Sequence, residues 1–451
     1  MITRVSVLAG LLGFILVIAF ALPASSQVSG GLETKDSPQL LSCSPAPCIL
    51  PNVRLFTYGM GGEYPTQAVV NPANTSQMMV AAIDGNCNTV GIFASEDGGV
   101  TWPIHRCIGT INATGDTVAS YDFNGVGYAG GSDDLSSMSL RSSADNGKHW
   151  SSPRVVDVEA SGLYSVGLAV DTSPASPFPN RLYVSSVHGG IYSLATRIHV
   201  SFSADGIHWG RRFLDKWQAN NIDFDPHLSL GEDGTAYVTW LRCMWTGGPC
   251  HKNGVPILLS KSTDGGDTWS APVVVARTNL VSPDDCGHGC LPNTSAPITN
   301  VPVTSIVGSG ASAMVYVVFY NWTGTQMQVQ VATSSDGGGT FGAPVRVSTS
   351  TFGDQFFQWI SATYDGTLAV TWMDRRNDPA NTKYQPFFAT SKDGVVFSPS
   401  RSLSTTLSDP ALSFAYLGGG SPNLWLGDTL YQVWMDTRSG QPRIELGGVQ
   451  F

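Results

Sequence analysis

Apolar residues in this chain occur in short runs rather than in long amphipathic stretches. One stretch shows the pattern: runs rich in Val, Leu, Tyr and Trp, separated by Gly, Asn, Asp and Pro, lie at Asn221–Leu228, Ala236–Leu241, Pro256–Ser260 and Ala271–Ala276. Such runs, bounded by turn-forming residues, predict β-strands. Helical periodicity longer than two turns is not seen. We therefore expect an all-β protein whose strands come in groups of four.

A polar phrase of the form Ser-X-Asp, followed by Gly and an aromatic residue, returns at intervals of about 50 to 70 residues. Its copies are Ser95–Trp102, Ser143–Trp150, Ser203–Trp209, Ser262–Trp269, Ser334–Phe341 and Ser391–Phe397. This recurrence indicates like units, each too small to bury its own apolar face. We place each copy between the third and fourth strands of a unit, where Asp and Ser can bond turn backbone and Gly can adopt positive φ.

Groups of four antiparallel strands repeated about an axis form a β-propeller. The phrase resembles the Asp-box, or BNR repeat, of the sialidase superfamily, which occupies the turn between the third and fourth strands of a propeller blade. The resemblance covers residues 51–451 and implies the fold. Asp-boxes also occur in propellers that are not sialidases, so it does not settle the function.

The sequence after the last phrase favours seven blades. Phe414–Leu417, Thr429–Met435 and Arg443–Phe451 predict three more strands, and Asn52–Tyr58 can supply the fourth. The N-terminal strand then closes the ring and leaves no free sheet edge. Six blades, as in sialidases, would follow if the C-terminal tail only completes the ring.

Composition and charge narrow the class of protein. The 451 residues include 50 Gly and 27 Pro, with 13% charged residues, which is typical of an all-β chain with many tight turns. A net charge of −10 argues against nucleic acid as a partner. We expect one propeller domain at 51–451, a monomeric protein and no cofactor.

The N-terminus predicts export. Arg4 precedes an apolar run, Val5–Leu22, and Ala24, Ser25 and Ser26 supply a small-residue cleavage site. We expect a signal peptide at 1–26, a lead-in at 27–50 and a secreted or extracytoplasmic protein without membrane association after removal of the signal. The alternative is that the run stays in place as a membrane anchor.

Eight cysteines in an exported chain predict disulfides between sequence neighbours: Cys43 with Cys48, Cys87 with Cys107, Cys243 with Cys250, and Cys286 with Cys290. His288 lies inside the last loop, but a metal site there would need a second ligand pair. Asp223 and Asp225 could bind calcium from one strand, although a buried Asp bonded to turn backbone explains them better. We predict no metal.

If the recurrent turns mark one face of the ring, the opposite face carries polar residues from every blade. The second strands end at Asp84, Asp133, Asp134, His188, Arg242, Tyr320, Asn321, Asp374–Arg376 and Asp436–Arg438, and the segments leading into the next blade carry Glu63, Tyr64, Asp116, Glu159, Tyr164, Asp223, Asp225, Gln355 and Tyr416. Propeller ligands are expected on such a face near the axis.

A second repeat, Trp-Met-Asp-X-Arg, occurs at Trp372–Arg376 and Trp434–Arg438. The Asp and Arg of each copy are two apart and share one side of a strand. They are either paired charges that hold the strand end or part of an arginine cluster that grips a carboxylate.

The resemblance to sialidases implies three arginines on the sugar carboxylate, an Asp as general acid, and a Tyr nucleophile polarised by a Glu. In family order the matching positions are Arg54, Asp84, Asp225, Arg242, Arg376 and Tyr416, with Arg438 as a further candidate for the carboxylate. Asp225 stands where Glu is expected, and Glu63 and Glu159 are alternatives.

The leading hypothesis is a sialidase-like exo-glycosidase acting on extracellular carbohydrate, with an anionic sugar held by the arginines. The main alternative is a non-catalytic propeller that binds a glycan or a protein through the same face. A lyase or another polysaccharide-active propeller is a third possibility.

Overall fold

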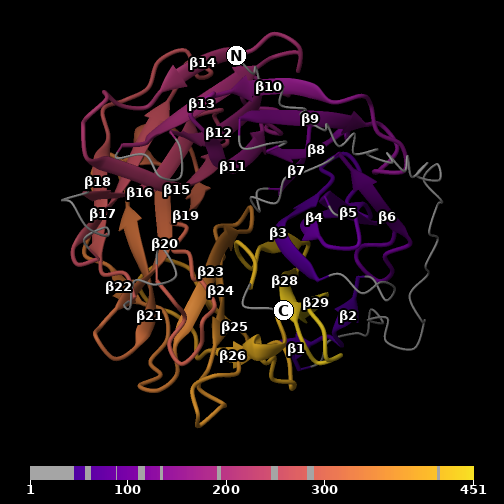
Figure 1. Ribbon diagram of the computed structural model, residues 1–451, viewed down its shortest axis with the longest axis vertical. Helices are drawn as coiled ribbons and strands as arrows, with labels where there is room; N and C mark the ends of the chain where they lie inside the picture. The colour runs from indigo at the N-terminus through magenta and orange to yellow at the C-terminus, as the bar shows by residue number, and fades with distance from the viewer. Residues whose placement is uncertain are drawn as a thin grey trace, which may run out of the picture.

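The computed structural model describes residues 45–55, 62–87, 89–109, 117–132, 136–189, 195–244, 252–281, 289–413 and 417–451. Seven antiparallel sheets stand in a ring, which is the predicted seven-bladed β-propeller (Figure 1). Blades 1 to 3 consist of β3 (Glu63–Val70), β4 (Met78–Asp84), β5 (Thr89–Ser95) and β6 (Ile104–Ile108); β7 (Thr117–Tyr121), β8 (Gly127–Ser132), β9 (Ser137–Ser143) and β10 (Arg154–Val158); and β11 (Leu163–Val170), β12 (Leu182–His188), β13 (Arg197–Ser203) and β14 (Gly210–Phe213).

Blades 4 to 6 follow in chain order. They consist of β15 (Asn221–Leu230), β16 (Ala236–Met244), β17 (Val255–Ser262) and β18 (Val273–Thr278); β19 (Val303–Val307), β20 (Met314–Trp322), β21 (Met327–Ser334) and β22 (Val345–Arg346); and β23 (Gln355–Ala362), β24 (Leu368–Asp374), β25 (Gln385–Ser391) and β26 (Arg401–Ser402). Two short 3-10 turns, Gly310–Ser312 and Pro410–Leu412, lie between strands.

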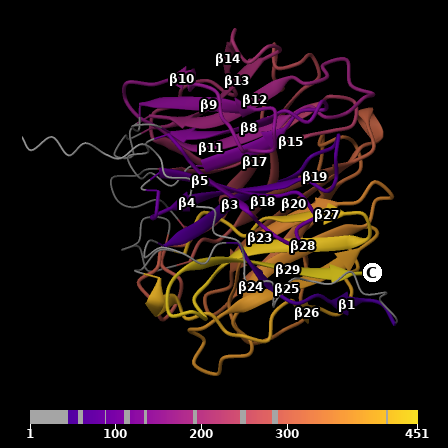
Figure 2. The ribbon, with the colours of Figure 1, turned by 90° about the vertical axis from the view of Figure 1, so that its right-hand side faces the viewer.

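Blade 7 joins the two ends of the propeller. Its strands β27 (Asn423–Leu426), β28 (Thr429–Asp436) and β29 (Arg443–Gln450) come from the C-terminus, and β1 (Cys48–Ile49) and β2 (Val53–Arg54) both pair with β29. Figure 2 shows β1 beside this sheet. The first strand of the blade is β27, later in the chain than the predicted 414–417, of which only Leu417 is described and lies outside any strand.

The core lies between neighbouring blades. The middle strands are buried on both faces, which explains apolar runs such as Met78–Ala82 in β4. At the junction of blades 1 and 7, Met78, Val80 and Phe93 pack with Val433 and Leu446. Adjacent sheets thus bury each other's faces, as expected for units that cannot fold alone.

Each recurrent turn lies between the third and fourth strands of blades 1 to 6, as predicted. In the turn after β17, Ser262 Oγ accepts from Gly266 N at 2.8 Å and donates to Asp264 Oδ1 at 2.8 Å. Asp264 also accepts from Thr268 N at 2.9 Å, and Trp269 Nε1 donates to Gly266 O at 3.1 Å. The polar residues of the phrase therefore satisfy the turn's own backbone, which is a structural role.

We expect Asp264→Ala to lower the free energy of unfolding by about 1–2 kcal/mol, because three donors to this side chain lose their acceptor. Chemical denaturation monitored by tryptophan fluorescence measures the effect. The matched control is Asp267→Ala in the same turn, whose carboxylate lies 3.9 Å from Arg212 on the surface and should change stability by less than about 0.5 kcal/mol. Equal effects of the two variants would contradict the structural role of Asp264.

The disulfide predictions are confirmed where the structure describes both cysteines. Cys87 and Cys107 form a disulfide that joins the turn between β4 and β5 to β6. Cys48, Cys243 and Cys290 are also disulfide-bonded. Their expected partners Cys43, Cys250 and Cys286 lie outside the described residues, as does the predicted signal peptide. Among the described residues there is no helix with the length and hydropathy of a membrane-spanning segment.

Candidate ligand-binding site

A cavity of about 320 Å³ lies on the axis of the ring, and every blade contributes to its wall. Residues of β3, β7, β11, β15 and β23 line it, together with the segments that lead into β19 and β27. The lining side chains are mainly hydroxyl, amide, aromatic and aliphatic: Thr66, Gln67, Thr117, Val118, Tyr164, Ser165, Val166, Leu168, Asp225, Pro226, His227, Leu228, Thr299, Val301 and Trp359. This volume falls in the range of small-molecule sites.

Bulges in the innermost strands shape this wall. In β15 the residues Asp225 and Pro226 stand opposite a single partner, Trp240, and the register shifts between Phe224 and His227. Asp225 has a φ of 52° there, and Ser165 in β11 has a φ of 51° at the corresponding bulge. A left-handed backbone at a residue other than Gly costs about 1 kcal/mol or more, and such strain concentrates at functional sites. The bulges turn these residues toward the axis.

His227 lines the cavity with a neutral imidazole. Its Nδ1 accepts from Thr304 N at 3.2 Å, so the proton lies on Nε2. Burial lowers the pKa of His227 to about 4. At neutral pH the ring is therefore a hydrogen-bond donor through Nε2 rather than a cation.

Trp359 stands across from His227 on β23, and the two rings meet edge to face with centroids 5.5 Å apart. Gln67 fixes the other side of the cavity, because its Nε2 donates to Leu168 O at 3.0 Å and its Oε1 accepts from Ala119 N at 3.1 Å. One amide thus ties the inner strands of blades 1, 2 and 3 together. Contacts between blades thus fix the Gln67 amide and the Trp359 ring in the cavity wall.

The four candidate arginines lie elsewhere, and each contacts a carboxylate. Arg242 bonds Asp223 at 2.6 Å and also Asp215. Arg376 bonds Asp374 at 2.5 Å, Arg438 bonds Asp436 at 2.8 Å, and Arg54 bonds Glu445 at 2.9 Å. Burial opposes protonation of Arg242, but its bonds to Asp223 and Asp215 raise its pKa above the usual value. Among the described residues that line the axial cavity there is no Lys or Arg.

The two Trp-Met-Asp-X-Arg copies have the same geometry. The indole Nε1 of Trp372 donates to Asp374 Oδ2 at 2.7 Å, and that of Trp434 donates to Asp436 Oδ2 at 2.9 Å. Each Asp also accepts from the backbone N of the Arg two residues later. These contacts fit the interpretation as paired charges that hold the strand end.

Glu63 and Asp84 lie together at the start of β3 and the end of β4, which are paired in register. Both are buried, and Asp84 Oδ2 lies 2.7 Å from His105 Nε2. Burial, with the negative charge of Asp84 added, raises the pKa of Glu63 to about 8, although Arg443 opposes the shift from 3.5 Å. Glu63 is therefore protonated at neutral pH, and neither carboxyl lines the axial cavity.

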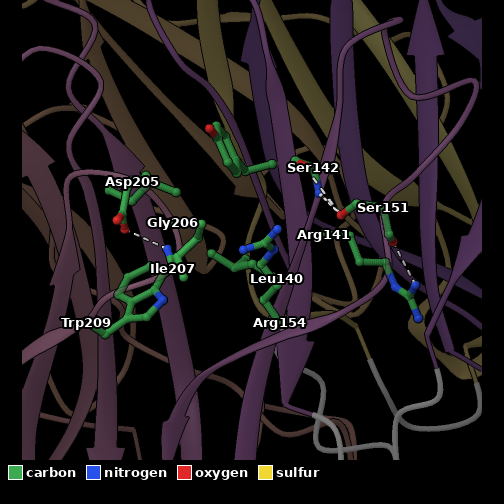
Figure 3. A pocket seen from close by; sticks show the side chains of 11 residues that line it. Leu140, Arg141, Ser142, Ser151, Arg154, Asp205, Gly206, Ile207 and Trp209 are labelled. Carbon is green, nitrogen blue, oxygen red and sulfur yellow. Dashed lines mark hydrogen bonds between the residues drawn. The ribbon is translucent and has the colours of Figure 1, made fainter.

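A second, smaller pocket of about 120 Å³ lies between blades 2 and 3. Figure 3 shows Asp205, Ile207 and Trp209 on one side of it and Arg141 and Ser151 on the other. The recurrent turn here is one residue shorter than the turn at Ser262–Trp269, and the buried Trp209 Nε1 finds no acceptor among the described residues. This pocket shares no lining residue with the axial cavity.

Of the candidate catalytic residues, the structure places only Asp225 in the axial cavity, and Tyr416 lies outside the described residues. Glu159 is on the rim of blade 2, bonded to His188 at 3.2 Å. Sequence analysis missed Gln67, His227 and Trp359 as cavity residues. The Pro at position 226 inside a strand run was the available signal for the bulge that brings His227 to the axis.

Comparison with known proteins supports the fold and does not identify the function. No family model matches the chain, and no curated protein matches it. Among solved structures, an ulvan lyase of polysaccharide lyase family PL25 aligns at 9% identity and a TM-score of 0.57 over 88% of this chain and 95% of its own. The polysaccharide lyase Uly1 aligns at 10% identity and a TM-score of 0.51 over 94% and 100%. A Hadza microbial sialidase aligns at 13% identity and a TM-score of 0.47 over 84% and 75%.

Proposed function

We propose that this protein acts on extracellular carbohydrate and binds a neutral sugar unit in its axial cavity. The observation that carries the proposal is the lining of that cavity: hydroxyl and amide side chains, the Trp359 ring and the neutral His227 donor, with no cation among the described residues. Sugars present hydroxyl groups on their edges and apolar C–H faces, which match polar donors and an aromatic face. The fold neighbours with a TM-score above 0.5 include polysaccharide lyases, which agrees with a sugar ligand.

A sialidase-like hydrolase, which would bind an anionic sugar, is the alternative to this proposal. It requires guanidinium groups that are free to hold a carboxylate, whereas Arg54, Arg242, Arg376 and Arg438 are each bound to a carboxylate of the protein. Displacing such a carboxylate would leave a half-buried charge without its partner. The geometry therefore favours a neutral sugar.

We expect Trp359→Ala to weaken binding to an oligosaccharide by at least about tenfold and Trp359→Phe to keep most of it, because the apolar ring face is lost only in the first. The ligand is first found on an array of neutral and acidic oligosaccharides, and its Kd is then measured by calorimetry. The control is Trp217→Ala, an exposed tryptophan stacked on Arg197 away from the cavity lining.

The same oligosaccharides, with a fluorogenic sialic acid glycoside and uronate-containing polysaccharides, are tested for turnover. Cleavage of the sialoside that is abolished by Tyr416→Phe would establish a sialidase-like hydrolase and contradict the neutral-sugar proposal. Binding unchanged by Trp359→Ala, or no binding to any sugar, would remove the axial cavity as the site.

A further inference from the structure

A buried cluster of one carboxylate and two imidazoles lies between blades 2 and 3, away from the axial cavity. Asp157 comes from β10, and His188 and His199 come from β12 and β13. Asp157 Oδ2 lies 2.8 Å from His188 Nε2 and 2.8 Å from His199 Nδ1. The three side chains are 1%, 7% and 4% exposed.

We propose that Asp157, His188 and His199 bind a zinc-class divalent metal ion that ties blade 2 to blade 3. Zn²⁺ takes imidazole nitrogen and carboxylate oxygen at about 2.0–2.2 Å, in sets of three or four. The three ligand atoms already lie within 4.8 Å of one another. Ligand atoms around a tetrahedral Zn²⁺ are about 3.4 Å apart. Each imidazole nitrogen lies 2.8 Å from Asp157 Oδ2, so these two separations must widen to admit the ion.

The backbone directs Asp157 into this cluster. The register between β10 and β9 shifts between Val155 and Asp157, which places a bulge just before the aspartate. A bulge in an outer strand changes the direction of the side chain that follows it. Here it aims the Asp157 carboxylate across the junction of two blades instead of along its own sheet.

The surroundings of His188 match those of a metal ligand. Its Nε2 faces Asp157, and its other nitrogen, Nδ1, lies 3.2 Å from Glu159 Oε2. A histidine that binds a metal through one nitrogen usually donates the other N–H to a carboxylate, which fixes the ring and makes the ligand more basic. Glu159 is the carboxylate in this position, and its side chain is 29% exposed.

Each imidazole nitrogen that faces the Asp157 carboxylate at 2.8 Å donates its N–H to it, so binding of a metal ion must release these protons. Arg211 Nε lies 3.6 Å from Asp157 Oδ1, on the oxygen that does not face the imidazoles.

A second group with ligand atoms, Cys87, His105 and Cys107, supplies a contrast. Its two sulfurs are joined in a disulfide and have no thiolate to give to a metal. Only the cluster at Asp157 therefore keeps three available ligands among the described groups of this kind.

Metal binding is tested on the whole propeller, residues 27–451, without a histidine tag, after treatment with chelator and buffer exchange. We expect Zn²⁺ titrated by calorimetry to bind with one equivalent at this cluster, and Co²⁺ to give the intense visible absorption of a four-coordinate site. Zinc at about 100 times its Kd should raise Tm by about 3 °C. His199→Ala and Asp157→Asn should each lose the Co²⁺ spectrum and the Tm shift.

His208→Ala is the matched control, because His208 also contacts an aspartate, Asp205, at 2.7 Å but lies exposed on a turn with no second imidazole. It should keep one equivalent of zinc. If the cluster variants do not fold, the unmodified protein still decides the question: a molar ratio near zero and an unchanged Tm would overturn the proposal and leave a hydrogen-bonded cluster. Binding that persists in folded His199→Ala would overturn it as well.

Discussion

Asp374→Ala is expected to lower the free energy of unfolding by about 3–5 kcal/mol. The Asp374 carboxylate is buried and accepts from Trp372 Nε1, from the backbone N of Arg376 and from the Arg376 guanidinium. Removing it leaves a buried indole N–H without an acceptor and an arginine that is 19% exposed without its counter-charge. Each such loss is costly, because water cannot replace the missing acceptor.

Urea unfolding at neutral pH measures this effect, with Asp365→Ala as the matched control. Asp365 is also paired with a cation, Lys392 at 3.0 Å, but both side chains are more than two-thirds exposed. Asp365 also accepts from Thr363 and Thr367 in its exposed turn, so its loss should lower stability, but by an amount well below the effect of Asp374→Ala. A small effect for Asp374→Ala, similar to that of the control, would mean that Arg376 is not committed to this aspartate and could serve a ligand.

Glu63→Gln changes the free energy of unfolding, and we expect this change to be about 4 kcal/mol more stabilising at pH 9 than at pH 4. Burial and the charge of Asp84 raise the pKa of Glu63 in the folded state from its ordinary value of 4.5 to about 8. Between these two values the folded protein binds more protons than the unfolded chain, so stability falls as pH rises. Above pH 8 the full cost of a buried carboxylate is reached, and Gln, which cannot ionise, avoids it.

The measurement is the difference in unfolding free energy between the wild type and Glu63→Gln, taken at several pH values from 4 to 9. Because burial lowers the pKa of His227 from 6.5 to about 4, its titration destabilises the protein as pH falls between these values. This contribution cancels in the difference, since both proteins contain His227. A flat line for Glu63→Gln would show that the Glu63 carboxyl is solvated in the folded protein.

The ring, the blade number and the placement of the recurrent turns could be predicted from the sequence because they depend on local patterns. Ser, Asp and Gly in each phrase bond their own turn, as at Ser262 and Asp264, and these contacts do not depend on distant residues. The closing strand was predictable for a different reason, because β29 needs a partner at its outer edge and Val53–Arg54 supplies one from the other end of the chain.

The position of the first strand of blade 7 and the composition of the axial cavity could not be predicted in the same way. β27 at Asn423–Leu426 is short and follows a Gly-rich stretch, so its pattern is weak. The cavity residues are set by bulges, and the extra residue in β15 changes which side chains of this strand turn toward the axis. The arginine pattern was visible, but whether each guanidinium meets an aspartate of its own blade depends on tertiary contacts such as that between Arg242 and Asp215.

The pairing of β1 and β2 with β29 sets the order of events during synthesis. Arg54 and Glu445, joined by a hydrogen bond, are 391 positions apart in the chain. The first partner is synthesised long before the second exists, so β1 and β2 cannot pair until the last strand has been made. A chain that stops before residue 443 lacks β29, the strand that joins the two ends of the ring.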